Sequence, residues 1–392
     1  MHGTSAPRRY DVDWLRVFAT YLLFVFHTGK VFDVAPFYHI KNAELSPSLD
    51  LLTGCIHQWH MPLFFLLAGW SARASLASRD TGAFLRERVS RLFIPFLAGC
   101  MLLCPLLKYI ELLRGMPMLP GGRVGTAAGF QESFFAFLPT FFTRFDRFTW
   151  AHLWFLLYLF VFTLLYLPLF IRMLRRPAVN ADAWPRLVVY LPIIPLALIQ
   201  VTLRGRWPGF QNLYDDWANF SYYSLYFILG FVLAQVPGLE AAVHREWKRA
   251  GLIGVGALLL MVPTGGGTPV AIVLNRALSG VAGWCCVVAW LGVAARFLDF
   301  SNRALRYLSE SAFPVYILHQ LGIVVVGYFV IQLSAGIGIK FLLVLVGALV
   351  ATLSVYHCLV RPAPPLRFLF GMKAVAPRHD RRRDVMPAPR VA

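Results

Sequence analysis

Charged side chains are scarce in this sequence, in which only 14% of the 392 residues are Asp, Glu, Lys or Arg. An average soluble domain carries about 25%. Hydrophobic residues make up 58% and aromatic residues 15% of the chain. This composition excludes an ordinary water-soluble domain, and it predicts an integral membrane protein.

Acidic residues are especially few. The chain has 19 Asp and Glu but 37 Lys and Arg, which gives a net charge of +18. A nucleic-acid-binding protein would gather its basic residues on one face or stripe. Here the basic residues lie between apolar runs, as the positive-inside rule of membrane topology requires. We therefore expect membrane lipids, and no nucleic acid, as partners.

The sequence also lacks any pair of CxxC motifs and any signal-peptide cleavage site. Its six cysteines lie in or beside apolar runs, which predicts neither a zinc site nor disulfides. Arg8 and Arg9 precede the first apolar run, but no cleavage site with small residues follows it. We expect this run to be an uncleaved first span.

Ten apolar runs are long enough, or nearly so, to be transmembrane helices of about 20 residues. They predict an all-α polytopic protein with spans near 12–29, 51–72, 92–113, 151–171, 187–203, 219–236, 250–263, 277–298, 312–334 and 337–359. The seventh run is the shortest. Residues 1–372 are then one transmembrane domain, and 373–392 a basic tail that we expect to be disordered.

The distribution of basic residues predicts which side each loop occupies. With a cytoplasmic N-terminus, 25 basic residues fall in inside segments and 11 in outside segments, while Arg16 lies within the first span. This asymmetry predicts that both termini are cytoplasmic, which requires an even number of spans. The outer loop 114–150 is long enough to cover a site.

The first span contains two ionisable side chains, which are candidates for function because they are costly in a membrane. Arg16 and His27 are 11 residues apart, so they lie on one helical face about 16 Å apart. Asp13 precedes Arg16 by one turn and is placed to hold its guanidinium. Two interpretations remain open: a functional pair, or an arginine at the interface and a histidine satisfied within the bundle.

Other ionisable residues lie at the ends of later spans. His57 and His60 share one face of the second span, but the sequence offers no third ligand at regular spacing, so we expect no metal. Arg88 and Arg91, with Arg86 nearby, lie where the third span begins and suit either phosphate binding or topology. Two single histidines of the fourth and ninth spans, His152 and His319, are supporting candidates.

Five ordered segments resemble the acyltransferase-3 family of integral membrane acyltransferases. The first span matches its D-x-x-R-x10-H motif through Asp13, Arg16 and His27. The match continues through HMPLFFLLAGW, RVSRLFIP, HLWFLLYL and SESAFPVYILH. Within the family, the sequence is most similar to the glucan biosynthesis protein C branch, whose members transfer succinyl groups to osmoregulated periplasmic glucans. Val17 and Ala68 depart from the residues common in the family.

The resemblance implies a membrane O-acyltransferase of the bacterial inner membrane. It would move a succinyl or acetyl group from cytoplasmic acyl-coenzyme A to a hydroxyl of a carbohydrate such as periplasmic glucan, with no tightly bound cofactor. His27 and Arg16 would be catalytic, with Asp13, His57, His152 and His319 in support. Arg86, Arg88 and Arg91 would bind the donor. The alternative is a multispan transporter of a small anionic or acylated solute, although the sequence shows no inverted repeat.

Overall fold

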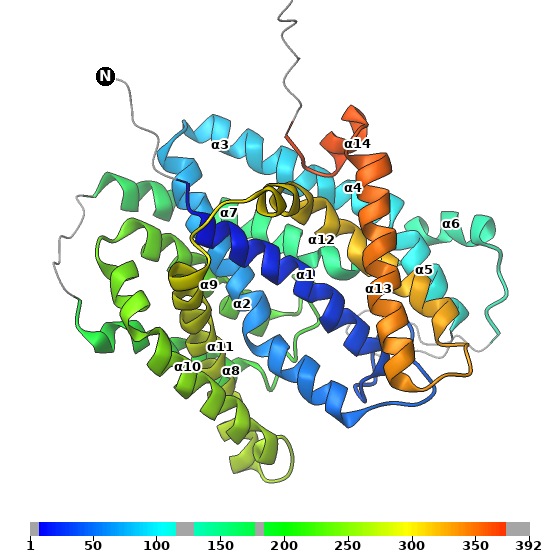
Figure 1. Ribbon diagram of the computed structural model, residues 1–392, viewed down its shortest axis with the longest axis horizontal. Coiled ribbons are helices and arrows are strands. Elements are labelled where there is room, and N and C mark those ends of the chain that lie inside the picture. Colours follow the sequence, from blue (N-terminus) through cyan, green and yellow to red (C-terminus); the bar gives the residue numbers. More distant parts are fainter. Residues whose placement is uncertain (1–7, 115–128, 177–183, 374–392) are drawn as a thin grey trace, which may run out of the picture.

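The computed structural model describes residues 8–114, 129–176 and 184–373, and every regular element within these residues is a helix (Figure 1). The predicted all-α fold is confirmed. The predicted basic tail lies outside the described residues, apart from Lys373.

The first half of the chain forms α1 (Tyr10–Phe32), α2 (Pro47–Ala77), α3 (Thr81–Arg88), η1 (Val89–Phe93), α4 (Ile94–Leu102), α5 (Cys104–Leu113), α6 (Phe134–Thr143), η2 (Ala151–Leu153) and α7 (Trp154–Arg175). The second half forms η3 (Arg186–Tyr190), α8 (Ile193–Leu203), α9 (Trp217–Gln235), α10 (Leu239–Thr264), α11 (Pro269–Phe297), α12 (Arg303–Val330), α13 (Ile337–Val355), η4 (Tyr356–Val360) and α14 (Pro364–Leu369).

Nine helical segments within the described residues are long and apolar enough to cross a membrane. They correspond to nine of the ten predicted spans. The remaining span, the predicted seventh, is the C-terminal part of α10, whose first three turns carry charged residues such as Glu246 and Arg249. Its apolar part is therefore shorter than the usual 20 residues.

Helix α10 nevertheless runs antiparallel to α11 over most of its length. Near one end Trp247 packs against Gly292, and near the middle Gly254 packs against Cys286. Near the other end Asn275 donates a hydrogen bond to the carbonyl of Met261. Helix α10 thus extends between the same two faces of the bundle as its long apolar neighbour.

Ion pairs show which helix ends share a face. Arg9 pairs with Glu240 at 2.6 Å, which joins the starts of α1 and α10. Glu310 pairs with Arg367 at 3.3 Å, which joins the first turns of α12 to α14. The start of α1 and the C-terminal α14 lie at one face, along the upper edge of Figure 1. We call this face the arginine face, after the arginines described below. The face at the other end of the membrane-spanning helices is called the opposite face.

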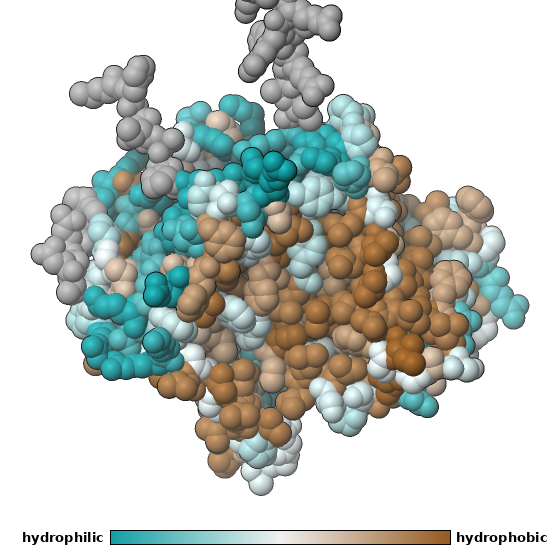
Figure 2. All heavy atoms as spheres, viewed as in Figure 1, coloured by the Kyte–Doolittle hydropathy of each residue, from teal (hydrophilic) through white to brown (hydrophobic). Residues whose placement is uncertain are grey.

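The surface between these faces is strongly apolar. Figure 2 shows hydrophilic residues gathered at the arginine face around α3, and a broad hydrophobic area below them. Large apolar side chains point outward from several helices, among them Leu252, Val270 and Ile339. Soluble monomers rarely expose contiguous apolar patches of more than a few hundred Å². This surface suits contact with lipid.

Two glycines allow α2 and α9 to cross closely at the centre of the bundle. A Cβ atom on Gly69 would lie 1.9 Å from the carbonyl oxygen of Phe227, and one on Gly230 would lie 1.9 Å from that of Leu66. Small residues permit this close backbone contact. Inside a membrane, such van der Waals packing drives helix association, because the hydrophobic effect does not act between helices there. The crossing fixes α2, which contributes to both cavities described below.

The third span is more irregular than its apolar run predicts. The helical segment begins at Thr81, before the predicted start at residue 92, and it contains the π-helical turn η1. A second break follows at Leu103, just before Pro105. Single π-helical turns occur often at functional sites. This one places Arg91 within the turn and Arg88 directly before it.

Candidate active site

A cavity of about 410 Å³ opens at the arginine face between α1, α2, α3, α7 and α12. We call it the arginine cavity. Its charged lining residues are Asp13, Arg16, Arg79, Glu87, Arg88 and Arg91. Four arginines therefore face two carboxylates, and the cavity carries an excess of positive charge.

Arg16 is held in this cavity by two side chains. Its Nη1 donates a hydrogen bond of 3.2 Å to Asp13 Oδ1, and its Nη2 donates to the hydroxyl of Ser71. Its side chain remains 38% exposed, toward the cavity. The predicted contact between Asp13 and Arg16 is thus present, and Ser71 is a second partner that comes from another helix.

Arg88 and Arg91 enter the cavity from one side, as their one-turn spacing predicts. The Arg88 guanidinium lies 4.7 Å from the centre of the Phe84 ring, and its Nε is buried without a hydrogen-bond partner among the described residues. Arg91 pairs with Glu87 at 3.5 Å. Arg86 is exposed and does not line the cavity.

The inner end of the cavity is formed by Thr20 and by three aromatic side chains, Phe64, Phe155 and Tyr316. Histidines lie directly behind this aromatic wall. The ring centre of Phe64 is 5.1 Å from that of His60, and the ring centre of Tyr316 is 5.9 Å from that of His319.

Three histidines from three helical segments meet behind the wall. The ring centre of His319 lies 5.2 Å from that of His27 and 4.9 Å from that of His152. Nδ1 of His27, Nδ1 of His152 and Nε2 of His319 are buried without a hydrogen-bond partner among the described residues. The structure thus brings together residues that are far apart in the sequence.

Backbone carbonyls orient two of these three rings. His152 Nε2 donates to the carbonyl of Ile317 at 2.9 Å, and His319 Nδ1 donates to that of Tyr316 at 2.6 Å. A carbonyl only accepts, so these nitrogens carry the hydrogen, and in the neutral rings the other nitrogen keeps its lone pair. Tyr316 also donates to the carbonyl of His152 at 2.6 Å.

His27 differs from the other two histidines because no described residue forms a hydrogen bond with either of its ring nitrogens. Its ring is half-buried, stacks on Tyr38 at 5.8 Å and meets Phe26 edge-on at 5.0 Å. Burial raises the pKa of the Tyr38 phenol well above its ordinary value, because the phenolate would lose its hydration. A neutral hydroxyl therefore stands beside an imidazole whose nitrogens have no hydrogen-bond partner among the described residues.

The histidines of the second span point in different directions. His60 is buried, and its Nε2 donates to the carbonyl of Ala19 at 2.7 Å. His57 is exposed and lines a separate pocket on the opposite face, with the Phe26 ring stacked 6.2 Å away. Within the described residues, no three His, Cys, Asp or Glu side chains are arranged to hold a metal ion.

Comparison with known proteins identifies the family. The sequence profile of the acyltransferase domain family, acyltransferase 3, matches residues 9–358. The chain belongs to the acyltransferase-3 family. It is therefore a membrane acyltransferase, an enzyme that transfers groups other than aminoacyl groups. This membership favours the enzyme over the transporter.

Individual relatives agree with the family assignment. The glucans biosynthesis proteins C of Escherichia coli (strain K12) and Escherichia coli (strain 55989 / EAEC) are each 24% identical to this chain over 407 residues. The comparison covers 99% of this chain and 100% of each relative. No solved structure is significantly similar to this chain.

Proposed function

We propose that this acyltransferase moves a succinyl or acetyl group from cytoplasmic acyl-coenzyme A to a hydroxyl of a periplasmic glucan. The relatives named for glucan biosynthesis support a carbohydrate acceptor. We place the protein in a bacterial inner membrane, and the excess of basic residues on the predicted inner segments supports an orientation with the arginine face in the cytoplasm. Residues 1–372 then form the transmembrane acyltransferase domain, and 373–392 form a cytoplasmic tail.

The arginine cavity is the proposed donor site, and it is the observation on which the proposal depends. Coenzyme A carries several phosphates, which guanidinium groups bind through charge-assisted hydrogen bonds. Arg88 has a buried Nε without a partner among the described residues, so a phosphate oxygen would satisfy it. Arg91 and Arg16 line the same space. Arg86, also predicted to bind the donor, is exposed outside the cavity, so we assign this role to Arg88 and Arg91.

Helix α1 connects this cavity to the proposed catalytic base. Thr20 lines the inner end of the cavity and precedes His27 by seven residues, which is about 10 Å of helical rise. The pantetheine arm of coenzyme A is long enough to cover this distance, and in this proposal it extends past the aromatic wall. The thioester would then lie beside His27.

The proposed reaction is a direct transfer between donor and acceptor. His27 accepts the proton of the acceptor hydroxyl while the hydroxyl oxygen attacks the thioester carbonyl carbon. A carbon–oxygen bond forms, the carbon–sulfur bond breaks, and His27 returns the proton to the departing thiolate. The products are the O-acyl glucan and free coenzyme A.

The remaining candidates would support this step through position. His319 packs beside His27 and His152 packs against His319, and backbone carbonyls orient both rings, so the two histidines would fix the ring that performs the proton transfer. Arg16, held by Asp13, would place a permanent cation next to the donor. His57 would act on the acceptor side, where it lines the opposite pocket.

The proposal is tested by transfer in proteoliposomes that contain the purified protein. Succinyl-coenzyme A and acetyl-coenzyme A, each labelled in the acyl group, are supplied at the arginine face, and unsubstituted glucan is supplied at the other. Mass spectrometry should find an ester on the glucan with one of the two donors. If neither donor labels the glucan while the protein is folded and correctly oriented, the proposed donor and acceptor are wrong.

A further inference from the structure

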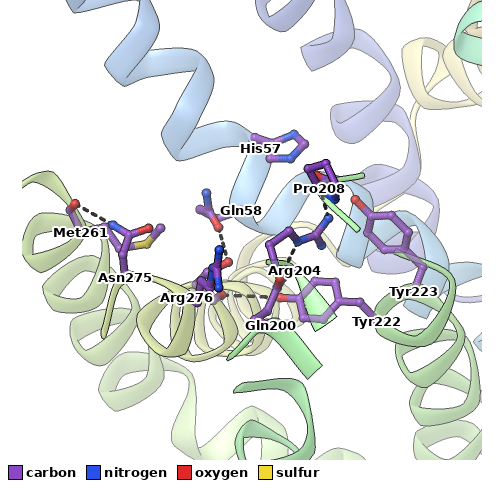
Figure 3. Close-up of a pocket in the computed structure, with 11 residues that line it drawn as sticks. His57, Gln58, Gln200, Arg204, Pro208, Tyr222, Tyr223, Met261, Asn275 and Arg276 are labelled. Atoms are coloured by element: carbon purple, nitrogen blue, oxygen red, sulfur yellow. Dashed lines mark hydrogen bonds between the residues drawn. The ribbon is translucent and has the colours of Figure 1, made fainter. Parts of the chain in front are cut away.

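A second pocket, of about 200 Å³, lies on the opposite face of the bundle (Figure 3). We call it the polar pocket. Among the residues that line it are His57, Gln200, Arg204, Tyr223, Asn275 and Arg276. Helix α2 carries His57 in this pocket and Ser71 in the arginine cavity, 14 residues or about 21 Å apart along the helix. The two cavities are therefore separate sites.

The polar pocket contains two arginines, and no carboxylate is among its lining residues. Arg276 forms no hydrogen bond or ion pair with any described residue, and its guanidinium packs against the backbone of Gly205. Arg204 donates from Nε to Gln200 at 2.8 Å and from Nη1 to the carbonyl of Pro208 at 3.2 Å. Its Nη2 remains available. Two guanidinium groups without a counter-charge in the lining favour an anionic ligand.

Neutral polar groups beside the arginines favour a ligand with hydroxyls. Asn275 uses its amide nitrogen on Met261 and Thr264, so its carbonyl oxygen is available as an acceptor. The hydroxyl of Tyr223 has no hydrogen bond with a described residue, while its ring stacks on Phe65 at 4.8 Å. Sugar hydroxyls both donate and accept, and such a mixture of amide, phenol and guanidinium groups satisfies them.

We propose that the polar pocket binds a saccharide unit that carries a carboxylate or phosphate substituent. This inference rests on the proposed function, because the saccharide would belong to the glucan acceptor. His57 at the pocket and His27 are separated by one aromatic ring, that of Phe26, which stacks on the first and meets the second edge-on. The pocket would therefore hold a unit of the polymer next to the one that reacts.

A subsite of this kind contributes to acceptor binding and leaves the chemical step unchanged. Removal of its contacts should raise the KM for a charged glucan at constant kcat, and it should leave the KM for the acyl donor unchanged. A purely structural role for the arginines would lower the amount of folded protein and affect both substrates.

The inference is tested by direct binding to the detergent-solubilised full chain. The probes are a succinylated glucan oligosaccharide and the same oligosaccharide after alkaline removal of its succinyl groups. A phosphorylated glucan oligosaccharide tests the other anionic substituent. The variants are Arg276→Gln, Arg276→Lys and Arg204→Gln. Arg206→Gln is the control, because Arg206 lies over Trp207 on the same face and does not line the pocket. Thermal unfolding confirms that each variant is folded.

We expect at least one charged probe to bind the wild type about tenfold more tightly than the neutral probe, a difference equal to about 1.4 kcal/mol. Arg276→Gln and Arg204→Gln should each remove most of this preference, Arg276→Lys should retain part of it, and Arg206→Gln should retain all of it. The inference is overturned if folded Arg276→Gln binds the charged probes as the wild type does. It is also overturned if the neutral probe binds equally well, or if phosphatidylglycerol nanodiscs displace the charged probe, because the pocket would then hold lipid.

Failure of this inference can be distinguished from failure of the proposed function. If the wild type prefers the charged probe but transfers no acyl group, the proposed binding role of the pocket is supported and the proposed reaction is overturned. If acyl transfer proceeds and Arg276→Gln leaves the KM for the acceptor unchanged, the proposed reaction is supported and the proposed binding role of the pocket is overturned.

Discussion

Arg16 and His27 belong to the same helix, but they face two different parts of the bundle. Arg16 donates a hydrogen bond to Ser71 in the arginine cavity, whereas the ring of His27 lies 5.2 Å from that of His319 behind the aromatic wall. Their 11-residue separation corresponds to about 16 Å along α1. One helix thus links a cationic cavity at the arginine face to a histidine cluster deep in the bundle.

The close crossing of α2 and α9 should contribute to the stability of the folded protein. Gly230→Ala should lower the free energy of unfolding by about 1–3 kcal/mol, because the added methyl group would meet the backbone of Leu66 and neither helix can move without disturbing the core. The measurement is thermal unfolding of the purified protein in detergent. Gly256→Ala is the control, since nothing lies within 4 Å of its Cβ position and alanine favours a helix. Equal melting temperatures for the two variants would contradict this account of the crossing.

The path of α10 predicts which loops face the same side of the membrane. Single cysteines in place of Ser78 and Gly266 should react from opposite sides with a membrane-impermeant maleimide, because Ser78 follows α2 at the arginine face and Gly266 lies between α10 and α11 at the other. In intact cells Gly266→Cys should be labelled, and Ser78→Cys should be labelled only after lysis. Exposed Cys358 is first replaced with Ser to remove background. Labelling of both cysteines from the same side would show that α10 does not cross.

Much of the fold could be predicted because the length of an apolar run is the main signal for a membrane-spanning helix. Nine predicted spans match helical segments of the structure within a few residues at most ends. The largest exceptions are the starts of the α3 segment, α11 and α12, at Thr81, Pro269 and Arg303, which lie before the apolar runs. Two exceptions have clear physical causes. Helix α2 begins at Pro47, a residue favoured at the first turn, and continues beyond the apolar run to Ala77. The segment that contains α3 and η1 begins with polar residues that follow the helix cap at Asp80, so hydropathy could not find its start.

The arginine cavity predicts different roles for neighbouring arginines. Arg88→Gln should raise the KM for acyl-coenzyme A roughly tenfold, since one charge-assisted hydrogen bond is lost, and Arg91→Gln should act in the same direction. Arg86→Gln is the matched control, because its side chain is exposed outside the cavity. Initial rates at varied donor concentration in reconstituted membranes provide the comparison. If all three variants raise the donor KM equally, the effect belongs to surface charge and not to the cavity.

The candidate site could be predicted only in part from the sequence. Spacing along one helix correctly placed Asp13 beside Arg16 and put Arg88 near Arg91. Contacts between helices have no comparable signal: Ser71 is an ordinary serine in the sequence, and only the packing of α2 against α1 brings it to Arg16. Tyr316 was identifiable in principle, because it precedes His319 by three residues and shares its helical face.

The proposed role of His27 as general base requires a proton-accepting nitrogen beside the thioester. His27→Gln keeps a polar side chain of similar reach but cannot take up the proton. Its turnover number should fall about a hundredfold to ten-thousandfold, the usual contribution of general-base catalysis. The variant should still bind the donor normally, since His27 does not line the arginine cavity.

The most direct test is therefore single-turnover transfer of a labelled acyl group from bound acyl-coenzyme A to glucan, in proteoliposomes with wild-type protein or His27→Gln at matched amounts. The account predicts equal donor binding, with the rate of ester formation reduced at least about a hundredfold in the variant. A near wild-type rate of ester formation in folded His27→Gln would contradict it, because the imidazole would then have no part in the chemical step.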